Sequence, residues 1–138
     1  MLQIKLNHVD SKMPTRGSKE AAGYDLYSYE TKRILPGQTV LYDTGISFKV
    51  PIGTYGRIAP RSGISKKSIM VNAGVVDRDY IGPVKVMLHN LSNETYVINQ
   101  NDRIAQLILE KIEICDIMQV KSLEDTERGE GGFGSTGV

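Results

Sequence analysis

Residues 73–80 read AGVVDRDY and carry the side chain with the clearest potential for catalysis. Two valines lead into Asp77, and Gly82-Pro83 then turns the chain, a pattern that predicts a β-hairpin with a carboxylate at its shoulder. A carboxylate that is partly sheltered by an apolar pair and bonded to water can act as a general base. The residues alone leave a second interpretation open, in which Asp77 supports the turn through its own backbone.

Two further segments have compositions that favour anion binding. Residues 59–65, APRSGIS, supply the Arg61 guanidinium and begin a short helical turn at Ser62 and Gly63, whose first N–H groups are free to bind an anion. Residues 128–137, RGEGGFGSTG, are half glycine, and glycine lets N–H groups approach phosphate oxygens closely. An arginine, a Ser-Thr pair and a phenylalanine add donors and a face for a base. The alternatives are a solvated surface turn and a disordered end.

Metal-binding and redox patterns are weak. Asp25, in the segment AGYDL at 22–26, either orients metal-bound waters or braces the core. His8 and His89 are isolated, so no metal-ligand spacing appears, and no GxxxxGKS or GxxxxGKT phosphate loop is present. Cys115 is the only cysteine, so it forms no intrachain disulfide, and we expect it to pack as a small buried apolar residue.

The overall composition describes one globular domain without a dominant charge. The chain has 138 residues, with 17 Lys and Arg against 16 Asp and Glu and a net charge of +1, so it lacks a field that would bind nucleic acid or an anionic membrane in bulk. The first twenty residues lack an apolar signal stretch, and no run reaches membrane-spanning length. We expect a soluble intracellular protein, with cytoplasm and nucleus undistinguished.

Alternation of apolar and polar residues predicts an all-β fold. It occurs at 2–6, 46–50 and 84–88, with Gly, Pro and Asn turn signals between the runs, which is typical of a sandwich or barrel. Residues 103–118 fit a helix or a strand, and we favour strand because five of them are β-branched isoleucines. The one helix expected is a short turn at 62–67.

Five segments, in this order, resemble the five motifs of the trimeric dUTPase family. They are AGYDL, PRSG, AGVVDRDY, DRIAQL and RGEGGFGSTG, at residues 22–26, 60–63, 73–80, 102–107 and 128–137. The resemblance implies a jelly-roll-like β-barrel in a homotrimer with a swapped C-terminal arm. It divides the chain into a barrel domain at 1–120 and a flexible glycine-rich arm at 121–138 that closes over an active site.

The same resemblance implies hydrolysis of dUTP to dUMP and pyrophosphate with Mg²⁺, in sites shared between subunits. Asp77 would be the general base that activates water at the α-phosphorus, and Asp25 would meet Mg²⁺ through water only. The residues implied to hold the phosphates are Arg61, Ser62, Gly63, Gln106, Arg128, Gly134, Ser135 and Thr136. Those implied to hold uracil and deoxyribose are Gly74, Val75, Val76, Tyr80 and Phe133.

Four positions depart from the commoner family pattern. Arg78 stands where an acidic or small residue is frequent, and we expect it to point to solvent. Pro83 removes one N–H from the hairpin. Asn101 and Ser68 stand at or near positions often held by glycine, and Asn tolerates the left-handed conformation well.

Two other functions remain as alternatives. dCTP deaminases share the fold but carry a glutamate in the strand after the hairpin, where this chain has Met87 in VKVMLHN. A thioether cannot act as that acid or base, which argues against deamination. The second alternative is a catalytically silent trimeric binding module, against which the presence of Asp77 and of the arm argues.

Overall fold

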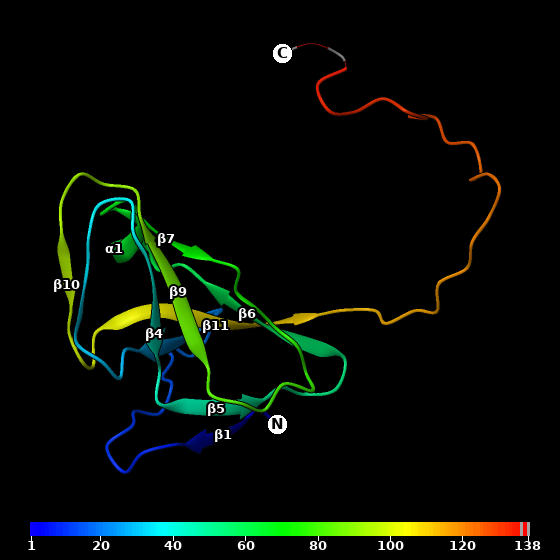
Figure 1. Cartoon of the computed structure of the whole chain (residues 1–138). Helices are drawn as coiled ribbons and strands as arrows, with labels where there is room; N and C mark the ends of the chain where they lie inside the picture. Colours follow the sequence, from blue (N-terminus) through cyan, green and yellow to red (C-terminus); the bar gives the residue numbers. More distant parts are fainter. Residues whose placement is uncertain (136, 138) are drawn as a thin grey trace.

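The computed structural model describes residues 1–135 and residue 137, which are almost entirely β-structure and connecting loops (Figure 1). The predicted all-β fold is confirmed, and the expected short helix is present as α1 (Ser62–Ser65). Nowhere in the described part of the chain does a helix have the length and apolarity that a bilayer crossing requires. The strands are β1 (Gln3–Leu6), β2 (Tyr24–Tyr27), β3 (Lys32–Ile34), β4 (Thr39–Asp43), β5 (Ile46–Lys49), β6 (Thr54–Ala59), β7 (Ile69–Asn72), β8 (Val75–Val76), β9 (Lys85–Asn90), β10 (Tyr96–Ile98) and β11 (Arg103–Lys111).

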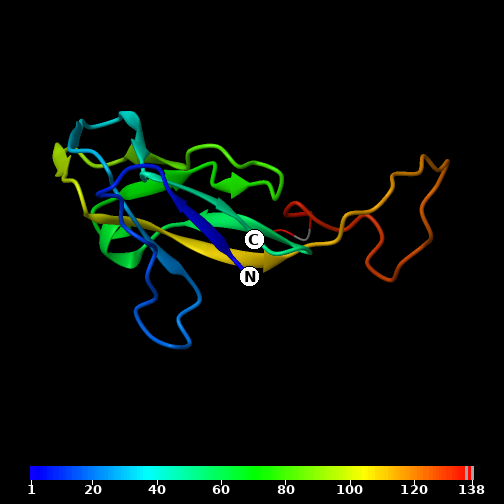
Figure 2. The same ribbon diagram turned by 90° about the horizontal axis from the view of Figure 1, so that it is seen from below.

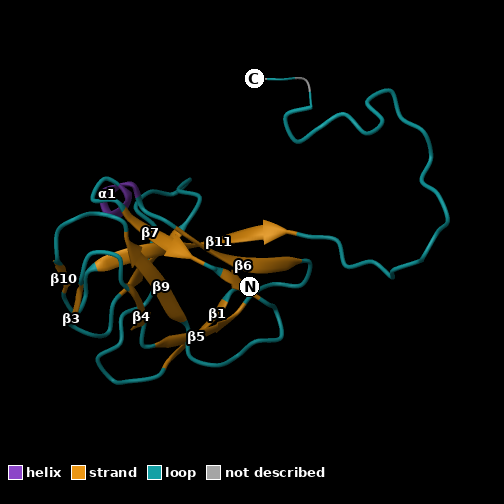
Figure 3. Ribbon diagram, turned by 45° about the horizontal axis from the view of Figure 1, so that its top comes forward, coloured by secondary structure: helices purple, strands orange, loops and turns teal. Residues whose placement is uncertain are grey.

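The strands pair in antiparallel sheets around one apolar core (Figure 3). The larger sheets have the orders β2-β11-β6-β8 and β4-β9-β7, and two-stranded sheets pair β1 with β5 and β3 with β10. On β9, Val86 and Leu88 are fully buried, as the alternation predicts. On β5, Ser47 is buried together with Ile46 and Phe48, so both faces of that strand are covered and the alternation understates its burial.

β11 lies inside its sheet, between β2 and β6, which confirms a strand at the start of 103–118. The strand ends earlier than its apolar pattern suggests, because β6 begins at Thr54 and offers no partner beyond it. The Ile112 N–H bonds the Gly53 carbonyl at 3.1 Å, and the following residues lead away from the barrel (Figure 2). Cys115 lies there, exposed, so the prediction of a buried cysteine was wrong.

Two turns contain a residue other than glycine in the left-handed conformation, which was expected for Asn101. Asn101 has a φ of 73° and Ser68 a φ of 60°. The Ser68 N–H bonds the Ser65 carbonyl at 2.9 Å, which closes the chain after α1 before β7 begins. These turns set the direction in which the neighbouring strands enter the sheets.

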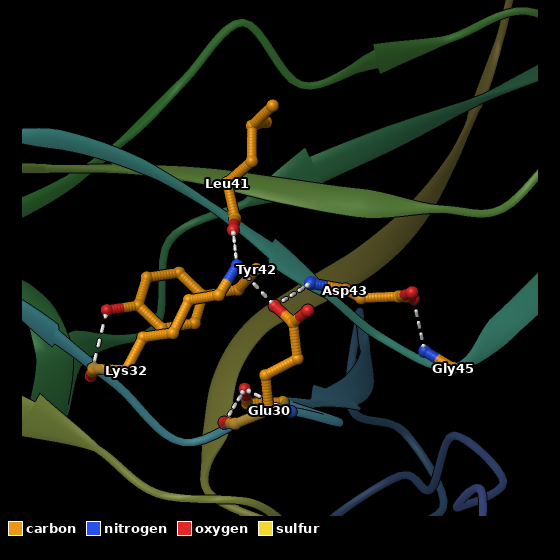
Figure 4. Close-up of polar contacts among 7 residues, drawn as sticks. Glu30, Lys32, Leu41, Tyr42, Asp43 and Gly45 are labelled. Carbon is orange, nitrogen blue, oxygen red and sulfur yellow. Dashed lines mark hydrogen bonds and ion pairs between the residues drawn. The ribbon is translucent and has the colours of Figure 1, made fainter.

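Tyr42 is among the largest fully buried side chains and ties β4 to β3 (Figure 4). Its hydroxyl donates to the Lys32 carbonyl at 3.3 Å. Beside it, Glu30 pairs with the Lys32 ammonium at 2.7 Å and accepts the Asp43 N–H at 3.3 Å. The Lys32 contact lowers the pKa of Glu30, and burial raises the pKa of Tyr42 to about 12.

Ionisation of Tyr42 should couple folding to alkaline pH. An ordinary phenol ionises near pH 10.0 and the folded one at about 12, so its contribution to stability is complete below pH 10.0 and is lost as the pH rises through about 12. We predict that Tyr42→Phe flattens the fall in the free energy of unfolding across this interval, measured by urea denaturation at several pH values. An equally steep fall in the variant would contradict the assignment to Tyr42.

Candidate active site

The connection from β7 to β9, here called the 73–84 loop, carries the predicted general base. Gly74 has a φ of 101°, and a Cβ there would lie 2.5 Å from the Ile58 carbonyl oxygen. The Gly74 carbonyl accepts the Ile58 N–H at 2.7 Å. Val76 then pairs with Gly56 of β6, so this part of the loop is joined to β6 by strand pairing and does not form a two-stranded hairpin of its own. The predicted hairpin is corrected in this respect, because Gly74 directs the chain toward β6.

The 73–84 loop forms one wall of a pocket of about 480 Å³. Most of its lining is apolar, and two charged side chains reach it. The lining residues are Val75, Val76, Asp77, Tyr80, Pro83, Val84 and Lys85. The Tyr80 hydroxyl donates to the Pro83 carbonyl at 2.7 Å, which fixes the ring within the loop. A largely apolar pocket with a few placed polar groups is typical of small-molecule sites.

Asp77 is exposed on the chain that carries it, so the neighbouring valines do not shelter it as expected. Its backbone carbonyl accepts the Tyr80 N–H at 3.1 Å, which forms the turn. Within the described residues its carboxylate takes part in no ion pair or side-chain hydrogen bond. The turn is formed by the backbone, so the carboxylate remains available to accept hydrogen bonds. Any shelter for this carboxylate must come from another surface.

β6 is braced next to the 73–84 loop by a cluster on its outer face. Tyr55 and Arg57 of β6 both donate to the Glu110 carboxylate of β11, Arg57 at 3.0 Å. The hydrogen bonds from Tyr55 and Arg57 lower the pKa of Glu110. Because Arg57 is the strand partner of Val75, the cluster holds the part of β6 to which the loop is clipped.

Arg78 reaches solvent only in part, so the prediction that it points to solvent is corrected in this respect. Its side chain is half-buried, and its Nε is buried with no hydrogen-bond partner among the residues described. It lies with Val50, Pro51 and Ile52 in the lining of a second pocket. The 73–84 loop turns this side chain back toward the connection between β5 and β6.

Arg61 lies beyond the other end of β6 and is held by a buried carboxylate. Its Nε donates to Asp25 Oδ1 at 2.9 Å, and its Nη1 donates to the Arg103 carbonyl at 3.2 Å. Arg103 also pairs with Asp25 Oδ2 at 3.6 Å. Sequence reasoning assigned Arg103 no role, because a register shift between Arg103 and Ala105 decides which strand face each occupies. The only feature of the sequence that could have indicated a role for Arg103 was its place in the motif DRIAQL.

The turn that follows Arg61 presents unused donors, as predicted. The first N–H groups used inside α1 belong to Ile64 and Ser65, and those of Ser62 and Gly63 have no acceptor in the described part of the chain. A Cβ added at Gly63 would meet nothing within 4 Å, so the turn is open on this side. The two free N–H groups and the Arg61 guanidinium can hold an anion.

Gln106 joins this anion-binding end from β11. It pairs with Ala59 on one side and with Asp25 on the other, and its Nε2 donates to the Pro60 carbonyl at 2.9 Å. A Cβ at Gly23 would lie 2.2 Å from Gln106 Oε1, so only glycine leaves room for this side chain. We call Arg61, Ser62, Gly63 and Gln106 the phosphate segment.

The 73–84 loop and the phosphate segment lie apart on one chain. Gly56, the partner of Val76, precedes Arg61 by five residues, which corresponds to roughly 17 Å along extended backbone. Asp77 lies one residue farther in the opposite direction. The structure therefore presents two separate half-sites on a single copy.

The predicted arm residues contact neither half-site. Arg128 Nε donates to the Gly131 carbonyl, and the Ser135 hydroxyl accepts the Gly132 N–H at 2.9 Å. Phe133 is fully exposed, and Gly134 is exposed beside it. Thr136 lies outside the described residues.

The described residues form no cluster of side chains that could bind a metal ion directly. Across the described residues, no group of three or more His, Cys, Asp or Glu side chains is placed to hold an ion. Asp25, the predicted contact through water, uses Oδ1 for Arg61, and its Oδ2 contact with Arg103 is longer than a hydrogen bond. Lone pairs of Oδ2 are thus left to accept from water.

Comparison with known proteins gives one consistent result. A sequence model of the dUTPase family matches residues 10–137. The deoxyuridine 5'-triphosphate nucleotidohydrolase of Kluyveromyces lactis is 54% identical, over 99% of this chain and 93% of its own. That of Saccharomyces cerevisiae is 52% identical, over 99% and 95%. The Staphylococcus bacteriophage 80alpha dUTPase, solved with dUpNHpp, superposes with a TM-score of 0.93 at 32% identity, over 100% of this chain and 99% of that one. This chain therefore belongs to the dUTPase family.

Proposed function

We propose that this chain hydrolyses dUTP to dUMP and pyrophosphate, which limits uracil incorporation into DNA and supplies dUMP for thymidylate synthesis. The observation that carries the proposal is the pocket of the 73–84 loop, with the unengaged Asp77 carboxylate at its wall. The names of the yeast relatives and the dUTP analogue bound to the phage enzyme support it. We also propose an intracellular site of action, in cytoplasm or nucleus.

Uracil and deoxyribose would be selected by the 73–84 loop. The backbone of Gly74, Val75 and Val76 would bond the uracil edge and come too close to admit the methyl group of thymine. Tyr80 would pack under the deoxyribose and leave no room for a 2′-hydroxyl. Two bonds support this selectivity, one from Ile58 to the loop and one from Tyr80 to Pro83 within it, because a rigid slot cannot adapt to a wrong base.

The reaction would be an in-line displacement at the α-phosphorus. The phosphate segment would hold the α- and β-phosphates, and Asp77 would accept a proton from the attacking water as its oxygen bonds to phosphorus. The bond from the α-phosphorus to the bridging oxygen breaks, and pyrophosphate leaves. Positioning and charge neutralisation would supply most of the catalysis.

Mg²⁺ is the proposed cofactor, held by water and phosphate oxygens. A hydrated ion fits this donor set, because Mg²⁺ keeps several waters and binds through few carboxylates. Asp25 would contact those waters through Oδ2 while Oδ1 holds Arg61. When bound, the ion neutralises charge on the phosphates. A phage phi11 dUTPase has been described with a structural Mg(II) ion.

We propose a homotrimer with shared active sites. One copy would supply the phosphate segment, a second the 73–84 loop, and a third the arm at 121–138 that follows the barrel domain at 1–120. The separation of the half-sites and the exposure of the arm support this arrangement. In the closed site, Phe133 would stack over uracil, and the outer phosphates would be clamped by Arg128, Gly134, Ser135 and Thr136.

The alternatives are disfavoured by specific side chains. Met87 on β9 lines a small pocket behind the 73–84 loop, where a deaminase would need an acid. The free Asp77 carboxylate argues against a catalytically silent binding module, since binding alone does not require it.

A substrate panel tests the proposed function directly. We predict that pyrophosphate release from dUTP with Mg²⁺ exceeds that from dTTP, dCTP or UTP by roughly hundredfold or more. Release should fall when Mg²⁺ is chelated. Ammonia from dCTP would instead identify a deaminase, and binding of dUTP without pyrophosphate release would identify a silent module.

Gly23 should be required for the position of Gln106. We predict that Gly23→Ala lowers kcat/KM for dUTP by roughly tenfold to a hundredfold, because the new Cβ displaces a phosphate-binding side chain. Gly17→Ala is the matched control, since a Cβ there meets nothing within 4 Å. If both variants hydrolyse dUTP like the wild type, Gln106 does not act as proposed.

A further inference from the structure

The Arg78 side chain is half-buried, and one nitrogen of its guanidinium lacks a hydrogen-bond partner within the described chain. Its Nε is buried and bonds to nothing in the part of the chain that the structure describes. Burying a polar group without a hydrogen bond is costly, so this nitrogen marks a side chain that is held in place by its packing. The other two guanidinium nitrogens are not among the buried atoms, so the charge of Arg78 remains accessible to an anionic partner.

The pocket around Arg78 has the character of a site for an acidic, partly apolar segment. It measures about 350 Å³, and its side chains include a second cation, Lys49, but no carboxylate. Its floor is apolar, from Val50, Pro51 and Ile52, and Ile52 is itself 84% exposed. An occupant that suits both features would offer carboxylates next to an apolar side chain.

Residues 123–127 of the arm have this composition. They read LEDTE, so three of the four residues after Leu123 are acidic and none is basic. All five residues are exposed, Leu123 by 85%. The segment and the Arg78 pocket are therefore complementary in charge and in apolar surface, and neither is covered by the chain that carries it.

We propose that the Arg78 pocket binds residues 123–127 of a second copy of this chain. This inference rests on the proposed homotrimer and deepens it by naming the contact that anchors the arm. From Lys111, an extended chain of the intervening length spans roughly 40 Å by residue 124, which reaches a neighbouring copy. Because Arg78 directly follows Asp77, the contact fixes the arm next to the loop that carries the catalytic carboxylate.

A second copy suits this role better than the same chain. To reach its own Arg78 pocket, the arm would have to reverse direction between Ile112 and Leu123. That stretch, IEICDIMQVKSL, has Asp and Ser but no Gly, Pro or Asn, and residues 112–120 form no turn in the structure. In the structure it runs out from the barrel and makes no hydrogen bond back to it after the one from Ile112 (Figure 1).

Disulfide cross-linking between two chain variants tests the contact. Cys115→Ser removes the only cysteine, and Lys49→Cys and Asp125→Cys are then placed in separate full-length chains that differ by a size tag and are co-expressed. We expect a mixed cross-linked dimer on a non-reducing gel after mild oxidation. Lys19→Cys, in an exposed loop away from the pocket, replaces Lys49→Cys as the matched control and should give little of this product.

The outcomes separate this inference from the proposed function. The contact would be overturned if no more mixed dimer forms than in the control. It would also be overturned if a single chain carrying both Lys49→Cys and Asp125→Cys forms only an intrachain bond. In either case, hydrolysis of dUTP by the same samples would leave the proposed function standing. Failure of the wild type to hydrolyse dUTP would overturn the proposed function whatever the cross-link shows.

Charge reversal provides a second, functional test. Arg78→Glu should raise the KM for dUTP by roughly tenfold, because it repels the arm that closes the site. Adding Glu124→Lys and Asp125→Lys in the same chain should restore most of the loss, while melting temperatures report whether each variant folds. A triple variant no better than Arg78→Glu would contradict the proposed pairing.

Discussion

The spacing of residues along β6 governs how this chain can act. Val76 pairs with Gly56 near the start of β6 and Arg61 follows its end, so the backbone separation from Gly56 to Arg61 is roughly 17 Å and Asp77 lies beyond it. A general base must reach the attacking water within a hydrogen bond, and that water must lie about 3 Å from phosphorus. Side-chain rotation cannot close the gap, because Asp25 holds Arg61 in place. This separation is the reason for proposing that the loop of one copy acts against the phosphate segment of another.

Each half-site is nevertheless complete in its own local geometry. Gly74 brings the loop against Ile58, and Gly23 makes room for Gln106, so backbone contacts too close for a Cβ shape both halves. Asp77 and the arm are both exposed on the single chain, and in the proposed trimer neighbouring copies would cover both. The Arg78 pocket, with its two cations and apolar lining, would provide the contact that keeps the arm in place.

Sequence patterns predicted what local chemistry determines. Alternation at 84–88 predicted the burial of β9, the isoleucines at 103–118 predicted a strand, and the residues after Arg61 predicted a short helix with free donors. The features that the sequence patterns did not predict depend on contacts with residues that are distant in the sequence. The clip of β8 to β6, the Asp25–Arg61–Arg103 contacts, the half-buried Arg78 and the exposed Cys115 all depend on strand register or on where a neighbouring strand ends.

Activity in hybrid trimers is the most direct measure of whether the half-sites act between copies. Asp77→Asn chains lack the base and Arg61→Gln chains lack the phosphate contact, so each alone should be nearly inactive. Co-expressed in equal amounts, they should recover about a quarter of the wild-type rate, because random assembly pairs an intact loop with an intact phosphate segment at that frequency. Hybrids as inactive as their parents, with mixed trimers confirmed by mass, would show that each copy works alone.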